Sequence, residues 1–411
     1  MDYDRLLDLG TELGRQLMSS GAEIYRVEES VRRLLTAYGL DPQVFAIPNC
    51  LIVSIATPEG RALTRMCRIP AHGTDIELLE RCNALCRRLC RQPLPVEEAR
   101  ELTARLIPES PRYPPSALLL GYMAASAFFS LFFGGGPGDG LCAALCGLAV
   151  GLCLIYGKTL TGGNSFFHTA VSAALAAGLA LLLAEIGLGA SAEAVTIGTL
   201  MVLVPGMALT SAMREIMAGD ILSGLERTAE VILTASAIAL GTALPLALGG
   251  DAPVEGSTAL SASVPACLWA FLACVGFGLV YNIQGRGILI CGLGAALGWL
   301  VYLLAMNLGA GDIFAAFAAA VVISAYSELM ARLRRCPVTG YLQVALLPLV
   351  PGAGIYHAMQ YCVAGQTQLF LSALLHTLGF AAALAVGAML MSSLLRAAAP
   401  RILRSGHSMT S

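Results

Sequence analysis

The sequence Leu-Val-Pro-Gly occurs at residues 203–206 and again at 349–352, each time in the middle of a hydrophobic segment long enough to cross a bilayer. Proline removes a backbone hydrogen-bond donor and glycine relaxes the chain beside it, so we expect a helix to break at each place. A membrane helix broken at mid-depth leaves polar backbone groups free, which is tolerated only where protein or a water-filled cavity covers them. Two such breaks at matching positions in two halves of a chain predict the binding site of a transporter.

The composition predicts a polytopic α-helical membrane protein that begins with a polar domain. Of the 411 residues, 57% are hydrophobic and 13% are charged, whereas soluble proteins carry about 25% charged residues. Residues 1–110 hold 14 of the 25 basic and 16 of the 27 acidic residues. We therefore expect a cytoplasmic α+β domain over 1–110, a first membrane unit over 111–250 and a second over 262–398. The N-terminus is acidic and no apolar core follows it, so it does not resemble a signal peptide.

Helical and strand patterns both occur in the polar domain. Apolar residues recur there at the spacing of a helix face, and one apolar run is rich in β-branched side chains and ends at a Pro-Gly-containing turn. The expected elements are four helices near 4–19, 24–38, 75–90 and 96–106, and a hairpin with strands at 43–56 and 61–69.

No set of residues in this domain predicts a catalytic site, a metal site or a cofactor. Glu23, Arg26 and Glu28 could form an acid/base site, but solvated helix charges and a helix–sheet contact are the favoured interpretation. Three cysteines at helical spacing extend an apolar stripe better than they match a zinc site, which usually adds a second cysteine pair. These cysteines are Cys82, Cys86 and Cys90.

Ten segments reach the length needed to cross a bilayer. All eleven Lys and Arg residues after position 110 fall on one side of these segments, and the opposite loops contain none. The positive-inside rule then places both termini in the cytoplasm and predicts a multi-pass protein of the inner membrane. The expected spans lie near 115–133, 141–157, 165–187, 195–217, 228–248, 263–283, 287–307, 312–331, 341–362 and 369–394.

The similarity between the two halves extends beyond the Pro-Gly pairs. Tyr156 corresponds to Tyr302 and Asn164 to Asp312, and the offset stays between 145 and 148 across four helices. Each unit contains five expected helices, an odd number, so the second unit enters the membrane upside down relative to the first. Inverted repeats of this kind support alternating access around a site between the halves.

A new half-helix is expected after each Pro-Gly pair, and its unpaired N–H groups and partial positive charge suit a carboxylate. Polar side chains follow each break within about two turns of helix. The alternative interpretation is a packing kink with no ligand. The predicted substrate-binding residues are Pro205, Gly206, Thr210 and Ser211 in the first half, Pro351, Gly352, Tyr356 and His357 in the second, and Asn164 and His168 near the start of the third span.

Ionisable residues near a membrane interior are costly and usually functional. Asp312 and His168 are therefore the candidates for proton coupling, and interfacial helix caps are the alternative. His376 is a weaker candidate, because a lone polar group in an alanine-rich helix often only hydrogen-bonds a neighbour. The candidates for a cytoplasmic gate, with plain interfacial charges as the alternative, are Arg214, Glu230 and Glu328.

Four motifs follow one another along the chain: Ser-Gly-Ala-Glu at 20–23, Gly-Gly-Asn at 162–164, Val-Pro-Gly at 204–206 and Pro-Leu-Val-Pro-Gly at 348–352. In this order they resemble the threonine/serine exporter family, and the resemblance covers nearly the whole chain. It implies export of threonine and serine with the proton gradient as the driving force. A two-subunit relative in that family is associated with export of succinate, so a small dicarboxylate is the alternative substrate.

The predicted function is secondary export of small amino acids by alternating access, and the chain is not predicted to be an enzyme. The alternative from another class is a membrane-anchored enzyme or a sensor that acts through the N-terminal domain. The expected partners are threonine, serine or another small carboxylate as substrate, protons and membrane lipid, while homo-oligomer formation is left open. No nucleotide-binding motif indicates a primary pump, and no basic surface indicates nucleic acid.

Overall fold

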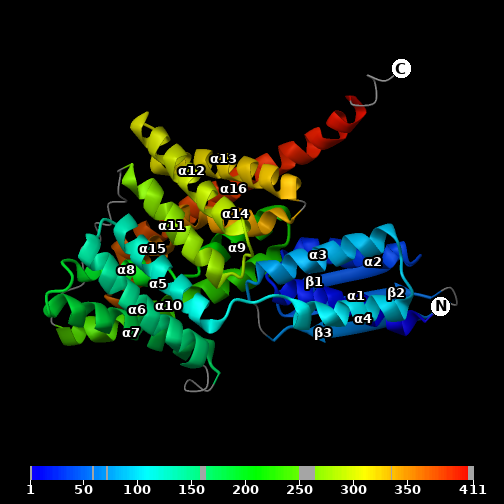
Figure 1. Cartoon of the computed structure of the whole chain (residues 1–411), viewed down its shortest axis with the longest axis horizontal. Coiled ribbons are helices and arrows are strands. Elements are labelled where there is room, and N and C mark those ends of the chain that lie inside the picture. Colours follow the sequence, from blue (N-terminus) through cyan, green and yellow to red (C-terminus); the bar gives the residue numbers. More distant parts are fainter. Residues whose placement is uncertain are drawn as a thin grey trace.

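The computed structural model describes residues 2–57, 60–70, 73–157, 163–249, 264–334 and 336–405. Predictions that concern Gly162 and residues 250–262 lie outside this part of the chain. A small N-terminal domain with one sheet stands beside a larger bundle of helices, and the last helix, α16, extends away from that bundle toward the C-terminus (Figure 1).

The N-terminal domain packs helices against one face of its sheet. Residues of its first two strands alternate between buried and exposed positions, as expected for a sheet that is covered on one side. Its elements are α1 (Tyr3–Ser19), α2 (Ile24–Ala37), β1 (Pro42–Ile47), β2 (Cys50–Ala56), β3 (Ala62–Arg68), α3 (Ile76–Arg91) and α4 (Val96–Glu109).

The sheet has three antiparallel strands in the order β1-β2-β3. The predicted pairing with the return strand is confirmed as β2 with β3, but the single strand predicted over 43–56 was wrong, because this run forms both β1 and β2. A two-residue turn at Pro48 and Asn49 divides the apolar run, and Ile47 pairs with Cys50 across it. Proline and asparagine favour turns, but the apolar residues on both sides hid this one. The four predicted helices of the domain are all present, with boundaries shifted by at most a few residues.

The core of this domain lies between α1, the sheet and α3. α1 crosses β2 at Gly14, where an added Cβ would lie 2.5 Å from Leu51 Cδ2. Cys82 and Cys86 are buried in the same core, as the apolar stripe predicts. Burial raises the pKa of the Cys82 thiol to about 12, so this side chain behaves as a small apolar group.

Twelve helices and one short 3-10 segment form the described part of the bundle. Among the described residues, seven helices are long and apolar enough to cross a membrane, and the bent pair of α14–η2 with α15 would make an eighth. The elements are α5 (Pro115–Phe132), α6 (Pro137–Tyr156), α7 (Ser165–Glu185), α8 (Ala192–Leu200), α9 (Gly206–Ala218), α10 (Ile221–Gly249), α11 (Pro265–Val280), α12 (Gly287–Asn307), α13 (Asp312–Arg334), α14 (Val338–Leu346), η2 (Leu347–Leu349), α15 (Gly352–Val363) and α16 (Thr367–Ser405). The predicted spans outside this set are the shorter helix α11 and the α8–α9 pair.

Corresponding helices of the two halves pack in corresponding pairs. In the first half α5 packs on α6, α7 on α10 and α9 on α10, and in the second half α11 packs on α12, α13 on α16 and α15 on α16. The halves meet through α5 and α11, where a Cβ added to Gly121 would lie 2.9 Å from the carbonyl oxygen of Gly276. Small residues at this crossing let two helix backbones approach closely.

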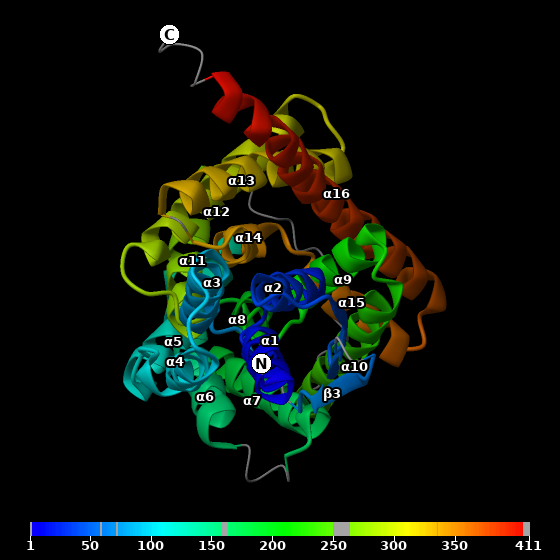
Figure 2. The same cartoon turned by 90° about the vertical axis from the view of Figure 1, so that its right-hand side faces the viewer.

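The N-terminal domain contacts one end of the bundle, which we call the docked end; the opposite end is the far end. The backbone N–H of Ile76 donates to the carbonyl of Tyr281 over 3.0 Å. Asn282 Nδ2 donates to Asp75 Oδ1 over 2.8 Å, and Asn282 itself adopts a left-handed conformation with φ of 55°. Seen from this side, α1 to α3 lie in front of the middle of the ring of helices (Figure 2). The segments contacted here belong to the loops that carry the basic residues.

Candidate functional site

Both Pro-Gly pairs interrupt a helix, as the sequence predicts. α9 begins at Gly206 and α15 begins at Gly352. Pro205 and Pro351 precede these helices with ψ angles of 39° and 53°, outside the helical range. The chain bends by 54° at the second break. Each break places a helix N-terminus inside the bundle, and the first N–H groups of a helix have no partner within it.

The two breaks pack directly against each other. A Cβ added to Gly206 would lie 3.7 Å from the Cα of Gly352 and would clash with Val350. A Cβ added to Gly352 would lie 2.8 Å from Val204 Cγ1, closer than real side chains approach. Glycine is therefore needed at both N-termini, because only a hydrogen at this position lets the two segments approach so closely.

A cavity of about 190 Å³ lies beside this contact, and its lining includes Pro205 and Gly206 from the first break and Val350 and Gly352 from the second. Its other walls include Thr74 from the N-terminal domain and Tyr281 from the docked end of α11. Sites for drug-sized ligands measure about 300–1,000 Å³, so this cavity suits only a small metabolite. The N-terminal domain thus supplies part of the wall of the space between the two breaks.

A polar series follows the first break toward the docked end. Thr210 is buried one turn after Gly206 and donates its hydroxyl to the Gly206 carbonyl over 3.3 Å. Arg214, one turn further, forms an ion pair with Glu23 of the N-terminal domain. Arg26 holds the other oxygen of the same carboxylate, with 3.1 Å between Nε and Oε2. One carboxylate therefore joins α9 to α2.

The Glu23 carboxylate stays charged although its side chain is only 6% exposed. Burial alone would raise the pKa of this group, but the charges of Arg214 and Arg26 outweigh burial and lower the pKa to about 2. Removing one partner from a buried ion pair costs about 3–5 kcal/mol, because the remaining charge is left uncompensated. Loss of Glu23 alone should therefore destabilise the contact between the two parts of the protein.

A second polar series follows the other break toward the far end. Gln360 Nε2 donates to the hydroxyl oxygen of Tyr356 over 2.5 Å, and the Tyr356 hydroxyl also meets Thr242 of α10. His357 is buried beside Tyr356, and its Nε2 has no hydrogen-bond partner among the described residues. The polar groups on α15 therefore form neutral contacts within the bundle.

The structure brings eight of the ten predicted substrate-binding residues to the two half-helices but leaves Asn164 and His168 apart. Asn164 is exposed and caps α7, where its Oδ1 accepts from the Phe166 and Phe167 amides. His168 is buried against Gly157 at the junction of α6 and α7. Neither residue lines the cavity between the breaks, because the third span of the first half runs beside α10 rather than beside α9.

Two of the three predicted gate residues lie around the same charged group, and the third lies apart from it. Arg214 holds Glu23, and Glu328 is close enough for its charge to act on Arg26. Glu230 is exposed on α10. The sequence did not identify Glu23 as the partner of Arg214, since the two lie in different domains and no local spacing connects them.

Asp312 is the first residue of α13 at the far end and pairs with His376 of α16, with 2.5 Å between Oδ2 and Nε2. Both side chains are partly exposed, at 39% and 54%. His376 was the weaker prediction from sequence, and its pairing depends on the packing of α13 against α16.

The chain matches two family models. One is described as putative threonine/serine exporter and matches residues 8–249, and the other is described as threonine/serine exporter, ThrE, and matches residues 266–394. The first match alone includes more than half of the chain, and the two together include the N-terminal domain and both halves of the bundle. No solved structure matches the chain.

Among its relatives, the chain is 24% identical to a probable threonine/serine exporter of Mycobacterium tuberculosis over 370 residues, which covers 86% of this chain and 69% of that protein. It is 23% identical to a threonine/serine exporter of Corynebacterium glutamicum over 400 residues, covering 94% and 81%. It also matches the pheromone-regulated membrane protein 10 of Saccharomyces cerevisiae with 24% identity, but spans only 31% of that longer protein. The alignments with the two bacterial relatives therefore extend over most of both chains.

Proposed function

Because the chain belongs to the threonine/serine exporter family, we propose that it is a secondary transporter that exports small amino acids, threonine and serine first. The observation that carries this proposal is the direct contact of the two Pro-Gly breaks beside a small cavity. Relatives named as threonine/serine exporters align over most of their length, which supports the substrate class. The family is one of membrane exporters, so the alternative of a membrane-anchored enzyme loses its support.

The topology that this mechanism needs is ten spans in two inverted five-helix units. The α8–α9 pair and the α14–α15 pair each count as one broken span in this proposal. The matching helix pairs in both halves support it, and so does the position of the N-terminal domain on the loops that carry the basic residues. Both termini then lie in the cytoplasm, and the docked end is the cytoplasmic end.

The substrate carboxylate binds at the half-helix N-termini in this proposal. The N–H groups after Pro205 and Pro351 supply donors and a partial positive charge without a buried cation. Thr210 and Ser211 from α9 and Tyr356 and His357 from α15 supply the polar groups for the ammonium and hydroxyl groups of the substrate.

The N-terminal domain acts as the cytoplasmic gate in this proposal. Thr74 lies in the wall of the cavity, and Glu23 links the domain to Arg214, two turns after the first break. Glu328 belongs to the same charged group through Arg26. Substrate that comes from the cytoplasm reaches the cavity only after this contact opens, so the described conformation corresponds to a state closed on the cytoplasmic side.

Proton coupling completes the proposal. The Asp312–His376 pair lies at the far end, within reach of the outer medium, and exchange of a proton there sets the pH dependence of transport. His168 remains the candidate for a proton-binding group at the docked end. An intramembrane pair of ionisable groups is a typical element of proton relays.

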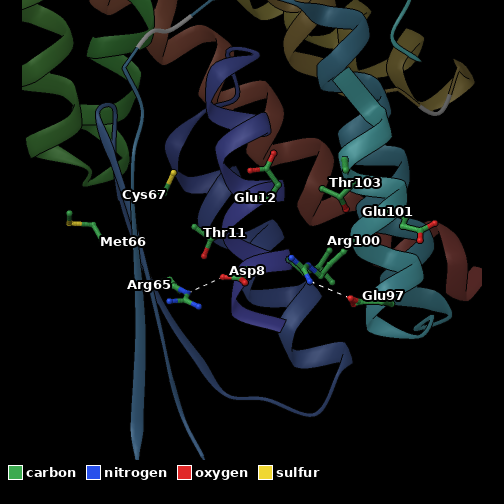
Figure 3. A pocket seen from close by; sticks show the side chains of 12 residues that line it. Asp8, Thr11, Glu12, Arg65, Met66, Cys67, Glu97, Arg100, Glu101 and Thr103 are labelled. Atoms are coloured by element: carbon green, nitrogen blue, oxygen red, sulfur yellow. Dashed lines mark hydrogen bonds and ion pairs between the residues drawn. The ribbon is translucent and has the colours of Figure 1, made fainter. Parts of the chain in front are cut away.

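A sensor role of the N-terminal domain is the second candidate function. An open cleft of about 600 Å³ lies between α1, β3 and α4 and is lined by Asp8, Glu12, Arg65, Glu97 and Arg100. Figure 3 shows that its guanidinium groups pair with its own carboxylates, Arg65 with Asp8 and Arg100 with Glu97. A ligand there would have to replace these ion pairs.

The experiment that tests the proposed function is counterflow into proteoliposomes that contain the purified full-length protein. Radiolabelled serine, threonine and succinate are compared side by side. Exchange of serine and threonine supports the amino-acid exporter, and exchange of succinate alone changes the substrate class but keeps the site. No exchange of any of them by folded protein would contradict the transporter and favour the sensor.

A further inference from the structure

The two half-helices carry polar groups at the same spacing from their breaks but point to opposite ends. Thr210 and Arg214 follow Gly206 toward the docked end, where Arg214 pairs with Glu23. Tyr356 and Gln360 follow Gly352 on α15, which lies on the side of the bundle away from the N-terminal domain (Figure 1). At the docked end the Glu23 carboxylate pairs with Arg214, the second polar residue of the α9 series, and with Arg26. Two guanidinium groups therefore neutralise it.

A carboxylate also lies near the far-end series, and among the described residues no ion pair neutralises it. Glu193 lies in the first turn of α8, one turn before Ile197, and Ile197 belongs to the same buried apolar cluster as Tyr356. One of its oxygens, Oε1, is buried and has no hydrogen-bond partner among the described residues. The residue as a whole is partly exposed. One face of this carboxyl group therefore reaches the far-end surface while the other points into the bundle.

The groups around Glu193 supply no positive charge. Asp139 of α6 accepts from the Gly136, Ala190 and Ser191 amides. Glu185 at the end of α7 is exposed, and α15 contributes Tyr356 and the buried His357. The sequence contains no Lys or Arg in 113–157, 159–213, 228–249 or 336–395, which include every element packed against α8.

A carboxylate with a buried, unpaired oxygen is costly, and such groups bind a proton instead. We propose that Glu193 is the carboxyl group that binds the driving proton at the far end, and that Tyr356 is its hydrogen-bond partner. The proton from the outer medium adds to the Glu193 carboxylate and converts it to a neutral acid, which donates to the Tyr356 oxygen. The same proton leaves when α8 and α15 rearrange and the carboxylate forms again.

This inference rests on the proposed export function and names its coupling residue. It assigns different roles to two acidic side chains at the far end. Asp312 is partly exposed and already paired with His376, so its loss changes the pH dependence of transport. Glu193 lies one turn from Ile197, which shares an apolar cluster with Tyr356 of the half-helix that begins at Gly352, so its loss uncouples transport from the proton gradient.

The test uses proteoliposomes with an imposed pH gradient and compares wild type with Glu193→Gln. Serine counterflow needs no net proton movement and persists in the variant, while gradient-driven serine accumulation is lost. Glu185→Gln, which removes a nearby exposed carboxylate, is the matched control and keeps both activities. Tyr356→Phe shifts the pH dependence of gradient-driven transport, because the partner of the protonated carboxyl is lost.

Gradient-driven accumulation at the wild-type level in Glu193→Gln would overturn the proposal, and so would joint loss of counterflow and accumulation in folded protein. If Glu193→Gln does not fold, Glu193→Asp decides the question: a shifted pH dependence supports the proposal and an unchanged one overturns it. Absence of counterflow in wild type would be a failure of the export function, which this comparison keeps separate.

Discussion

The half-helices α9 and α15 begin with the same backbone break and end in different chemistry. Gly206 and Gly352 are in contact, and each is followed one and two turns later by polar side chains. On α9 the series ends in Arg214, which a separate domain holds through a buried ion pair. On α15 it ends in Gln360, which hydrogen-bonds Tyr356 within the same helix.

This difference predicts that mutation of a partner residue perturbs the docked end more than the far end. A neutral hydrogen bond contributes about 0.5–1.5 kcal/mol to stability, whereas breaking a buried ion pair by removing one partner costs about 3–5 kcal/mol. In the proposed mechanism the shared break supplies the binding groups, and the unequal ends supply the direction. An exporter that rests with its cytoplasmic end closed needs a strong contact at that end.

Removing both breaks should have the largest effect. In Pro205→Ala with Pro351→Ala the backbone donors return and each pair of half-helices can become continuous, so serine counterflow should be lost while membrane insertion persists. Pro245→Ala is the control, since Pro245 also lies inside a helix but far along α10 from the breaks. Wild-type counterflow in the double variant would remove the breaks from the mechanism.

Breaking the docked end alone should weaken domain docking. Glu23→Gln leaves Arg214 and Arg26 without their carboxylate, at a cost of about 3–5 kcal/mol. Hydrogen exchange of the Ile76 amide, which docking protects, reports the effect. The matched control on the same helix is Glu29→Gln, whose pair with Arg33 is exposed and contributes about 0–1 kcal/mol. Equal protection in both variants would contradict the proposed gate.

Filling the contact between the breaks should have a smaller effect on stability. Gly206→Ala places a methyl group against Val350, and overpacking of this kind costs about 1–3 kcal/mol. Gly178→Ala is the control because its nearest neighbour would be Pro245 at an ordinary 3.7 Å. Thermal unfolding of the purified protein measures both, and an unchanged melting temperature for Gly206→Ala would mean that the breaks do not touch.

The pH dependence of domain docking should follow the titration of Glu23 at the docked end. The pKa of Glu23 is lowered to about 2 from its ordinary value of 4.5, so its contribution to docking is complete above 4.5 and is lost as the pH falls toward 2. Exchange protection of Ile76 should therefore stay constant between about pH 5 and 8. Loss of protection within that range would mean that another group controls the gate.

Removing the exposed pair at the far end should have the smallest effect. Asp312→Asn leaves His376 without a carboxylate, so transport should continue with an altered pH dependence. The pH profile of counterflow measures this change. A profile identical to wild type would exclude Asp312 from proton handling.

Local patterns in the sequence predicted the helices, the breaks and the glycines at the breaks, because proline and glycine act on the backbone where they stand. The pairs that join distant segments could not be predicted in the same way. Glu23 meets Arg214 and Asp312 meets His376 only after the helices pack, and Glu193 gave no signal because it falls between two expected spans. The turn at Pro48 was missed because apolar strands lie on both sides of it.

The central claim is that the two breaks form one binding site. Equilibrium binding of radiolabelled serine to the purified full-length protein, compared among wild type, Pro205→Ala, Pro351→Ala and the double variant, tests it most directly. The account predicts one site per chain in wild type and loss of binding in each single variant. Binding that survives in either single variant, or two sites per chain in wild type, would contradict it.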